Sequence, residues 1–358
     1  MKVLFDGYWW ISGPPSGKMV LNETVNAWAN QYPEDELTLV VPHGDKREAQ
    51  SSVPPGVRLE TSRLRFHPAI NVIEIPRIRR NLGDIDAILT QNFATPSSQS
   101  FVYVHDAIFQ SNPEWFTRAE RAYLASIPVL ARLARGVVTS TSTERARIQK
   151  YNPHLTNIAV SGLAVSTRLL SAASSRGNRG LREKRFLLSV GRLNIRKNIR
   201  TLIDAALEAD VLSPEYPLVV VGESAGKLPK LPPQVDDAVR NGSILFLGHV
   251  EDGELRWLYE NCDALVYISL AEGYGLPPVE ARELGTEVIV SDLPVFRETI
   301  GTEGTFVDPT DAVEIGRALR NVKQGQRRST AVTLTSWRRV VENIRSLVGS
   351  TQEVGRRR

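Results

Sequence analysis

The chain is poor in cysteine, in long apolar runs and in net charge. Cys262 is the single cysteine among 358 residues, which excludes an internal disulfide and a cysteine-based zinc site. Apolar runs such as PLVVVG and DALVYISL are far shorter than the roughly 20 residues that cross a bilayer. The first residues predict a strand rather than a secretory signal. We therefore expect a cytoplasmic protein, with the Cys262 thiol packed where a helix meets a strand.

The net charge of +4 is small for this length, which disfavours extensive binding to nucleic acid. Positive charge is nevertheless concentrated between residues 63 and 80, where Glu74 is the only acid. The arginines of this stretch are Arg63, Arg65, Arg77, Arg79 and Arg80, and the chain ends in Arg356, Arg357 and Arg358. Two interpretations stay open: a basic face on an anionic membrane, or a solvated surface with a frayed tail.

Short apolar runs bounded by turn residues recur along the chain and alternate with helical segments. Among them are KVLF, LTLVV, DAILTQ, SFVYVHD, FLLSVG, PLVVVG, ALVYIS and EVIVSD. Many are continuously hydrophobic, as strands buried on both faces are. Helical periodicity marks residues 17–31, 118–134, 198–210, 252–261, 277–285 and 311–323. The alternation predicts an α/β fold with parallel sheets and helices on both faces.

One segment interrupts this series. Residues 166–184 are rich in Ser, Gly and Arg, have no clear period and are typical of a linker. The linker divides the chain into two doubly wound, Rossmann-like domains, residues 1–165 and 185–333. An amphipathic helix and a basic tail follow, residues 334–358. Two such domains facing each other would form a ligand cleft at the carboxyl ends of their strands.

The first glycine turn, WWISGPPSGKMVLNE, only partly matches the P-loop of nucleotide hydrolases. A P-loop has four residues between its glycines, followed by Lys and a Ser or Thr that binds magnesium. Here Pro14, Pro15 and Ser16 alone lie between the two glycines, and Met19 stands where the hydroxyl residue is required. The hydrolase interpretation is therefore disfavoured.

The densest chemical signal lies in SLAEGYGLPPVEARELG, residues 269–285. A predicted strand runs into a loop that contains Glu272, and a helix begins at Pro277. Such a loop presents backbone N–H groups and a positive helix end to an anion. Sugar hydroxyls are donors that suit a carboxylate beside an anion. Glu272 and Glu280 would therefore flank a phosphate, and each would bind a different sugar.

A second cluster, SVGRLNIRKNIRTLI, begins at residue 189. The strand ends at Gly191, and Arg192 and Lys197 follow in the turn and at the start of the next helix. Cations at a helix N-terminus oppose its dipole, and a bound phosphate would offset this cost. We expect these two cations to neutralise a diphosphate.

Together, SVGRLNIRKN and GHVEDGELRWLYENCDALVYISLAEGYGLPPVEA resemble the donor-binding half of glycosyltransferase family 4, the retaining enzymes of GT-B fold. The resemblance covers residues 186–310 with specific motifs and extends more weakly over the N-terminal half, through VHDAIFQSNPEWF. It implies two Rossmann-like domains facing a central cleft, with a C-terminal helix that crosses back to the first domain.

The resemblance also implies roles for individual residues. It assigns Glu280 to the ribose of a nucleotide sugar, Glu272 to the donor sugar and phosphate, and Arg192 and Lys197 to the diphosphate. His105 of YVHD would contact the donor sugar beside the reacting carbon. Further donor contacts would come from Gly13, Gly17, Gly191, Val250, Gly273, Tyr274, Gly275 and Leu276, and acceptor-side contacts from Asp106 and Lys18. We expect structural or surface roles for His43, His67 and His154.

The implied function is a retaining transfer of a sugar from a nucleotide sugar to a hydroxyl of a glycan or lipid-linked glycan. HDAIFQSNPEWF is similar to bacterial mannosyl- and rhamnosyltransferases, which favours GDP-mannose. No cofactor and no metal are expected, because the two cations and the helix end can stabilise the departing diphosphate. The alternative is a non-catalytic protein of the same fold that binds a nucleotide sugar or a membrane surface.

A metal-dependent glycosyltransferase of another fold would need an Asp-x-Asp motif. Asp84-Ile85-Asp86 supplies one, but it precedes a predicted strand, where acids in a polar turn are common. We therefore expect a cytoplasmic enzyme, peripheral on the inner face of the cell membrane if the arginine-rich stretch binds lipid.

Overall fold

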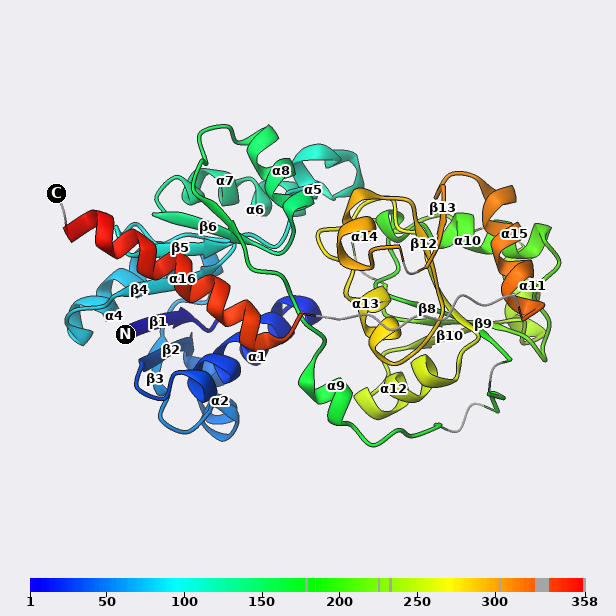
Figure 1. The fold of residues 1–358 in the computed structure, drawn as a ribbon, viewed down its shortest axis with the longest axis horizontal. Helices are drawn as coiled ribbons and strands as arrows, with labels where there is room; N and C mark the ends of the chain where they lie inside the picture. Colours follow the sequence, from blue (N-terminus) through cyan, green and yellow to red (C-terminus); the bar gives the residue numbers. More distant parts are fainter. Residues whose placement is uncertain are drawn as a thin grey trace. The chain divides into compact units, whose positions relative to one another are not determined.

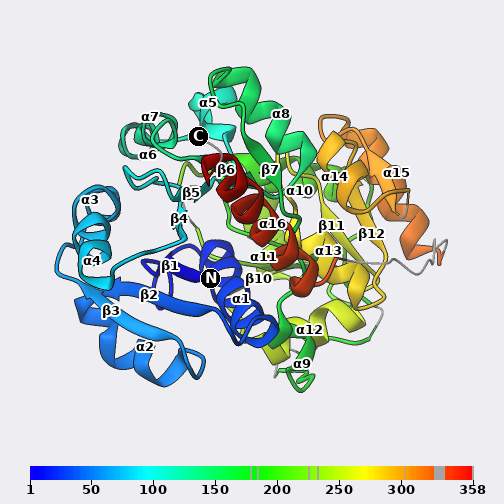
Figure 2. The ribbon, with the colours of Figure 1, turned by 60° about the vertical axis from the view of Figure 1, so that its left-hand side comes forward.

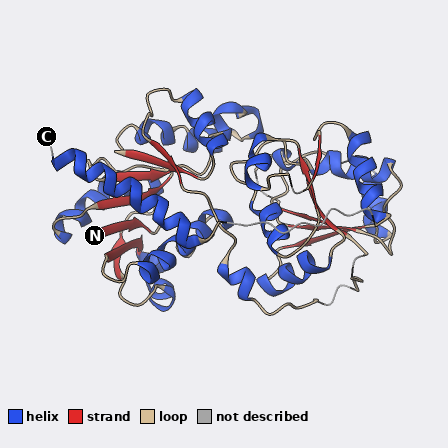
Figure 3. Cartoon of the chain, in the orientation of Figure 1, coloured by secondary structure: helices blue, strands red, loops and turns tan. Residues whose placement is uncertain are grey.

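The computed structural model describes residues 1–177, 180–183, 185–224, 226–231, 234–302, 304–325 and 335–356. This part of the chain divides into two compact units (Figure 1). Unit 1 contains residues 1–111, 118–164 and 335–358, and unit 2 contains residues 112–117 and 165–334. Each unit is a parallel sheet with helices packed against it (Figure 3).

The sheet of unit 1 has seven strands in the order β3-β2-β1-β4-β5-β6-β7, all parallel. The strands are β1 (Lys2–Asp6), β2 (Glu36–Pro42), β3 (Arg58–Ser62), β4 (Ala87–Gln91), β5 (Ser100–Tyr103), β6 (Gly136–Thr139) and β7 (Ile158–Val160). The order reverses direction between β1 and β4. Ligands of such sheets bind beside this switch point, at the carboxyl ends of the strands.

Helices connect these strands, as parallel pairing requires. They are α1 (Pro15–Gln31), α2 (Lys46–Ser52), α3 (His67–Ala69), the π-helical η2 (Ile70–Glu74), α4 (Ile75–Leu82), α5 (Ile108–Ser111), α6 (Arg118–Leu124), α7 (Ser126–Ala131) and α8 (Ser142–Tyr151). The arginine-rich stretch at 63–80 therefore contains α3, η2 and the first part of α4.

Residues 118–134, predicted as one helix, form two short ones. Pro128 lies inside α7 and has no N–H to donate to the carbonyl of Leu124, and its ring crowds that carbonyl. α6 accordingly ends at Leu124, and α7 begins two residues later.

The sheet of unit 2 has six parallel strands in the order β10-β9-β8-β11-β12-β13. They are β8 (Leu187–Val190), β9 (Leu218–Val221), β10 (Ile244–Gly248), β11 (Ala264–Tyr267), β12 (Val288–Ser291) and β13 (Thr305–Val307). The order reverses direction between β8 and β11, which places the second switch point there.

Two apolar cores cover the two faces of this sheet. Leu187, Leu218 and Val220 pack with α10 (Ile199–Glu208), α11 (Gln234–Arg240) and α15 (Ala312–Lys323). The alternate residues Leu188 and Val219 pack with α9 (Thr167–Ser171), α12 (Asp252–Asn261), α13 (Leu276–Glu283) and α14 (Pro294–Thr299). Since neighbouring strand residues point to opposite faces, each strand must be apolar throughout. The predicted doubly wound α/β architecture is confirmed.

The C-terminal helix α16 (Trp337–Arg356) belongs to unit 1 and lies alongside α1 (Figure 2). Arg345 of this helix donates hydrogen bonds of 3.1 and 3.2 Å to the buried carboxylate of Asp35, and its guanidinium lies over the ring of Tyr32. The chain thus returns to its first domain, as the fold class predicted. Arg357 and Arg358 of the predicted tail lie outside the described residues.

The segment predicted as a linker contains α9, and its apolar side chains Leu169 and Leu181 are buried in unit 2. Residues 178, 179 and 184 of this segment lie outside the described residues. Within the described parts of the chain, no helix combines the length and the apolar character needed to span a bilayer.

Candidate active site

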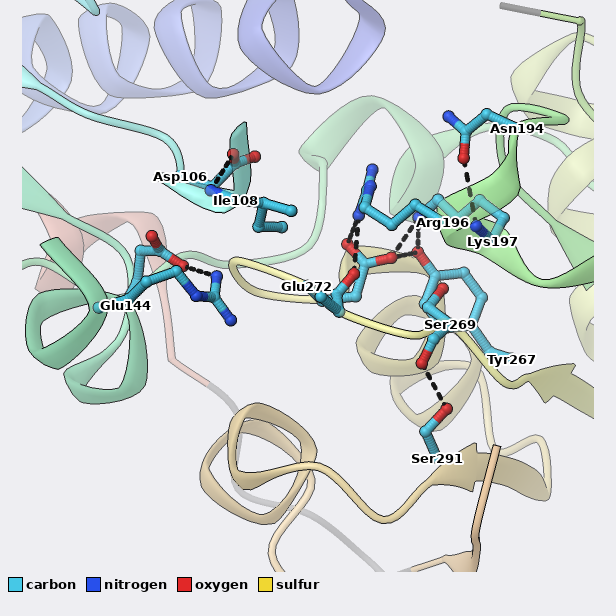
Figure 4. A network of polar contacts seen from close by, with 12 residues as sticks. Asp106, Ile108, Glu144, Asn194, Arg196, Lys197, Tyr267, Ser269, Glu272 and Ser291 are labelled. Atoms are coloured by element: carbon cyan, nitrogen blue, oxygen red, sulfur yellow. Dashed lines mark hydrogen bonds and ion pairs between the residues drawn. The ribbon is translucent and has the colours of Figure 1, made fainter. Parts of the chain in front are cut away.

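The strongest concentration of charge in unit 2 lies at its switch point, beyond the carboxyl ends of β8 and β11. The turn after β8 contains the single 3-10 turn η4 (Ile195–Lys197). The Asn194 side chain accepts a 3.2 Å hydrogen bond from the Lys197 N–H, which shapes this turn (Figure 4). Asn198, in the left-handed conformation, donates to the carbonyl of Ile268 at 3.2 Å. The two loops are thereby held together.

Glu272 forms the centre of this cluster (Figure 4). Its Oε2 lies 2.6 Å from Nη1 of Arg196, and its Oε1 lies 2.5 Å from Nζ of Lys197. The Tyr267 hydroxyl donates to Oε1 at 3.0 Å, and Arg196 also donates to the carbonyl of Ala271 at 3.0 Å. The carboxylate is therefore buried, with 6% of Glu272 exposed, and the two cations beside it are partly buried.

The electrostatics of the cluster follow from this burial. Burial alone would raise the pKa of Glu272, but Arg196 and Lys197 outweigh it and hold that pKa at about 2. Burial lowers the pKa of Lys197 to about 8, although the Glu272 carboxylate acts in the opposite direction. The cluster therefore carries an excess of positive charge at neutral pH, next to a backbone loop suited to an anion.

Arg192 and Lys197 are predicted to neutralise a diphosphate, and this role stays a prediction. Lys197 contacts Glu272 together with Arg196, whereas the Arg192 side chain is exposed. All three lie in the same motif, and the 3-10 turn decides which of them face the carboxylate. Gly191, at the start of the motif, donates its N–H to the carbonyl of Val221 at 2.9 Å and continues the sheet pairing.

The loop between β11 and α13 supplies backbone donors. Gly275 precedes the helix with φ of +84°, and a Cβ there would lie 2.4 Å from the Phe296 ring, so this position requires glycine. Pro277 and Pro278 have no N–H, which leaves the N–H groups of Gly275 and Leu276 as the donors at this helix end. The predicted loop residues Gly273, Tyr274, Gly275 and Leu276 are thus contiguous with Glu272.

Glu280 lies one turn into α13, where its Oε2 accepts a 2.7 Å hydrogen bond from the hydroxyl of Tyr259. Burial raises the pKa of Glu280 to about 7. The two glutamates therefore differ strongly in acidity. Glu272 is ionised at all pH values near neutrality, and Glu280 titrates there.

Val250 and His249 follow β10. The Val250 side chain is buried in the core of unit 2, with 7% exposed, which leaves only its backbone as a candidate nucleobase contact. The His249 ring is exposed and lies 3.9 Å from a carboxylate oxygen of Glu251.

The switch point of unit 1 carries His105, two residues beyond the end of β5. Its Nε2 lies 2.8 Å from Oε1 of Gln91, the last residue of β4. Burial, and secondarily the nearby His67, lowers the pKa of His105 to about 4. His105 is therefore a neutral imidazole at physiological pH.

His67 was expected to be a structural or surface residue. It is fully buried, and its Nε2 lies 2.7 Å from Oδ2 of Asp6, the last residue of β1. Its ring stacks on Tyr8 at 4.1 Å and meets the ring of Trp9 edge to face at 5.3 Å. Asp6, His67 and Gln91 were not selected from the sequence. The sequence does offer one indication of this site, since Asp6 is a polar residue at the end of an apolar strand, just before the first glycine turn.

The predicted glycine turn in unit 1 has a steric explanation inside the chain. A Cβ on Gly13 would lie 2.4 Å from the Trp9 ring, and one on Gly17 would lie 2.6 Å from it. Gly13 is in the loop before α1, and Gly17 lies within the first turn of that helix. Lys18 follows in α1 with its side chain partly buried.

Asp106 caps the short helix α5, since its Oδ1 accepts a 3.2 Å hydrogen bond from the Ile108 N–H (Figure 4). The Asp84-Ile85-Asp86 motif lies at the opposite edge of the sheet, before β4, where Asp86 exchanges hydrogen bonds of 2.8 Å with the backbone of Lys2. Among the described residues, no group of three or more His, Cys, Asp or Glu side chains could hold a metal ion.

Two doubly wound units, each with its polar residues at the switch point, define the class of GT-B-like proteins. Residues 173–334 match the family of glycosyl transferases group 1, so unit 2 carries the domain of these enzymes. The predicted family resemblance is confirmed at the level of this domain.

Comparisons with individual proteins agree with this domain. The chain is 35% identical over 142 residues to the O-antigen chain mannosyltransferase RfbU of Salmonella typhimurium. That match covers 40% of this chain and 39% of RfbU, so the chain spans about two fifths of this relative.

Two solved structures share the fold. Sucrose-phosphate synthase from Thermosynechococcus elongatus is similar with a TM-score of 0.69 and 18% identity, covering 100% of this chain and 98% of that one. HepE from Anabaena, in complex with UDP-glucose, is similar with a TM-score of 0.62 and 17% identity. That match covers 98% of this chain and 95% of the HepE chain.

Proposed function

We propose that the protein is a glycosyltransferase that moves a sugar from a nucleotide sugar to a hydroxyl of a glycan or lipid-linked glycan. One observation carries the proposal. Glu272 and Glu280 lie on either side of a backbone anion loop, and two partly buried cations lie against Glu272. Carboxylates accept hydrogen bonds from sugar hydroxyls, whereas cations and backbone N–H groups bind phosphate. A nucleotide diphosphate sugar combines these groups in one molecule.

The proposed chemistry requires stabilisation of a departing diphosphate. Arg196, Lys197 and the N-terminus of α13 provide positive charge for it, and Glu272 offsets one of the two side-chain charges until the phosphates bind. Such preorganised charge makes a metal-independent transfer plausible on electrostatic grounds. Retention of the anomeric configuration, proposed from the family resemblance, is tested by the anomeric signals of the product in proton NMR.

We propose GDP-mannose as the donor. Support comes from RfbU, which is named a mannosyltransferase of the O-antigen chain, and from the HDAIFQSNPEWF segment. The complex of HepE with UDP-glucose makes UDP-sugars the main competitors.

The test of this function is a thermal-shift screen with GDP, UDP, ADP and dTDP and their sugars, followed by a turnover assay with and without EDTA. A ligand that binds only the folded state raises its stability by RT ln(1 + [L]/Kd). The proposal expects a shift with one base and donor consumption that survives EDTA when an acceptor is added. Binding without any turnover would instead favour the non-catalytic alternative.

We also propose that unit 1 contacts an anionic membrane, as a peripheral protein on the inner face of the cell membrane would. Phe66, Ile73 and Val129 are 59%, 58% and 61% exposed and line one apolar groove of about 380 Å³ between α3, η2 and α7. Arginines 63, 65, 77 and 80 are exposed on the same stretch, and its one acid, Glu74, is buried and accepts from the Leu64 N–H. Exposed apolar side chains and exposed arginines on one stretch suit an anionic lipid surface.

Sedimentation with vesicles tests this membrane contact. The double variant Arg77→Glu/Arg80→Glu should lose binding to vesicles that contain phosphatidylglycerol, and pure phosphatidylcholine vesicles should bind poorly. The matched control exchanges an exposed arginine of unit 2, Arg317→Glu, and should bind normally. Equal loss in both variants, or self-association through the groove in place of vesicle binding, would contradict the membrane contact.

A further inference from the structure

Gln91 connects two parts of the polar cluster in unit 1. Its backbone N–H donates a 3.2 Å hydrogen bond to Oδ2 of Asp6, and its side-chain Oε1 lies 2.8 Å from Nε2 of His105. These residues close three neighbouring strands, β1, β4 and β5, at the switch point of the sheet. Gln91 itself is 6% exposed, so water competes little for its amide.

Asp6 fixes the position of Gln91. Its Oδ2 also receives hydrogen bonds from Nε2 of His67 at 2.7 Å and from Nδ2 of Asn71 at 3.0 Å. Asp6, His67 and Asn71 are all fully buried. A buried carboxylate oxygen with three donors has little freedom to move, and the end of β4 is held to it.

The ring of His105 is held as well. The ring of Trp9 packs against it with centroids 5.3 Å apart, and the ring of Tyr103 with centroids 4.8 Å apart. The imidazole is neutral near pH 7, because burial lowers its pKa to about 4. A neutral imidazole has one N–H, which lies on one nitrogen only.

The atom beside Nε2 decides which nitrogen that is. In the structure the Gln91 amide turns Oε1 toward the ring at 2.8 Å, and because a carbonyl oxygen can only accept, this orientation of the amide places the proton on Nε2. Nδ1 then keeps a lone pair, and it has no hydrogen-bond partner in the described part of the chain.

We propose that Gln91 is a positioning residue that selects the Nε2–H tautomer of His105 and so makes Nδ1 an acceptor for a substrate hydroxyl. The identity of the hydroxyl rests on the proposed glycosyl transfer, in which a sugar donor or acceptor presents it. A protonated Nδ1 would repel the same hydroxyl hydrogen. Asp6 and His67 contribute indirectly, because His67 contacts the Asp6 carboxylate and that carboxylate accepts a hydrogen bond from the backbone N–H of Gln91.

The tautomer is tested without any substrate, by long-range proton–nitrogen NMR of the nitrogen-15-labelled protein at pH 7, with His105→Asn to assign the ring. The expected spectrum has the proton on Nε2. Gln91→Leu removes the acceptor and should give a mixture of tautomers, whereas Gln91→Glu should restore the Nε2 proton because a carboxylate also accepts. A proton on Nδ1 in the wild type, or an unchanged spectrum in Gln91→Leu, would overturn the proposal.

Turnover provides the second readout. Gln91→Leu should lower kcat/KM about tenfold, as loss of a partner that orients an imidazole does. Gln31→Leu removes another partly buried amide of unit 1, which donates to Glu342, and should leave kcat/KM unchanged. A tautomer that responds as expected in a protein without any turnover would refute the proposed function and leave the positioning role standing. Equal losses in both leucine variants would reduce Gln91 to a structural residue.

Discussion

The hydroxyl of Tyr259 holds the carboxylate of Glu280 through a 2.7 Å hydrogen bond. Tyr259 is fully buried on α12, and Glu280 lies on α13, so the bond links two helices beneath the anion loop. Burial raises the pKa of Glu280 to about 7, more than the hydrogen bond from Tyr259 lowers it. The free protein therefore holds this carboxyl in both protonation states at physiological pH.

We predict that binding of the nucleotide sugar strengthens as pH rises through 7. In the proposed complex the ribose hydroxyls donate to an ionised Glu280, so binding at lower pH must first remove its proton. Affinity should be about tenfold weaker at pH 6 than at pH 7.5, as linkage to a pKa near 7 requires. Calorimetric titration with the donor found by the thermal-shift screen measures it. Glu280→Gln should bind the donor weakly, and its affinity should not change with pH. If the affinity of this variant still rose with pH, another group would be responsible for the titration.

A second prediction concerns the ion cluster of Glu272. Glu272→Ala leaves the partly buried Arg196 and Lys197 without their carboxylate, which should lower the free energy of unfolding by about 3 kcal/mol. Nucleoside diphosphate should stabilise this variant more than the wild type, because its phosphates no longer compete with Glu272 for the cations. Turnover should fall at least about 100-fold, since the proposed function assigns Glu272 to the donor sugar as well.

Denaturant unfolding with and without the diphosphate measures both effects. The control is Asp204→Ala, which breaks the exposed pair with Arg200 on α10 and should cost less than about 1 kcal/mol. If Glu272→Ala were as stable as this control, the cluster would contribute nothing to the fold.

The sequence predicts the fold well because the signal is local. A strand buried on both faces must be apolar throughout, and Leu187, Leu188 and their neighbours meet this requirement in two opposite cores. The glutamates of unit 2 are likewise local, since Glu272 and Glu280 share one loop and one helix. The choice between Arg192 and Arg196 depends on the geometry of a single 3-10 turn, which composition does not encode.

The polar cluster of unit 1, formed by Asp6, His67 and Gln91, could not be predicted from local sequence. His67 and Gln91 are 61 and 85 residues from Asp6, and only the pairing of β1 with β4 and the packing of α3 bring them together. Each residue taken alone looks like an ordinary polar position. Contacts of this kind follow from the order of the strands, which a single sequence does not specify.

A third prediction concerns stability in acid. The pKa of His105 is about 4 in the folded protein, below its ordinary value of 6.5. His105 of the unfolded protein binds a proton as pH falls below 6.5, whereas His105 of the folded protein does so only near pH 4. Between these two values the proton favours the unfolded protein, so the free energy of unfolding is highest above pH 6.5 and falls as pH drops toward 4. The loss should be about 2 to 3 kcal/mol.

The measurement is the difference in unfolding free energy between the wild type and His105→Asn across this range. The difference cancels the contributions of groups that both proteins share in this cluster, such as the Asp6–His67 pair. A difference that does not vary between pH 6.5 and 4.5 would show that His105 is protonated in the folded protein.

The last prediction concerns the glycine turn before α1. Alanine in place of a helical glycine normally stabilises a helix by about 0.5 to 1 kcal/mol. Gly349 of α16 has open space around the position of its Cβ, so Gly349→Ala should show this gain. Gly17→Ala should instead destabilise by about 1 to 2 kcal/mol, because its Cβ would lie 2.6 Å from the ring of Trp9.

The ring of Trp9 cannot easily yield, since it is 6% exposed and packs against both His67 and His105. The effects of Gly17→Ala and Trp9→Ala on stability should therefore be coupled. In a Trp9→Ala background, itself less stable by about 3 kcal/mol or more, Gly17→Ala should become stabilising, as Gly349→Ala is in the wild type. Denaturant unfolding of the four proteins of this cycle measures the coupling. If Gly17→Ala remained destabilising without the indole, the glycine would be required by the turn itself. If Gly17→Ala is stabilising in the Trp9→Ala background, the small residues of SGPPSGK are required because they leave space for the ring of Trp9, which packs against His105.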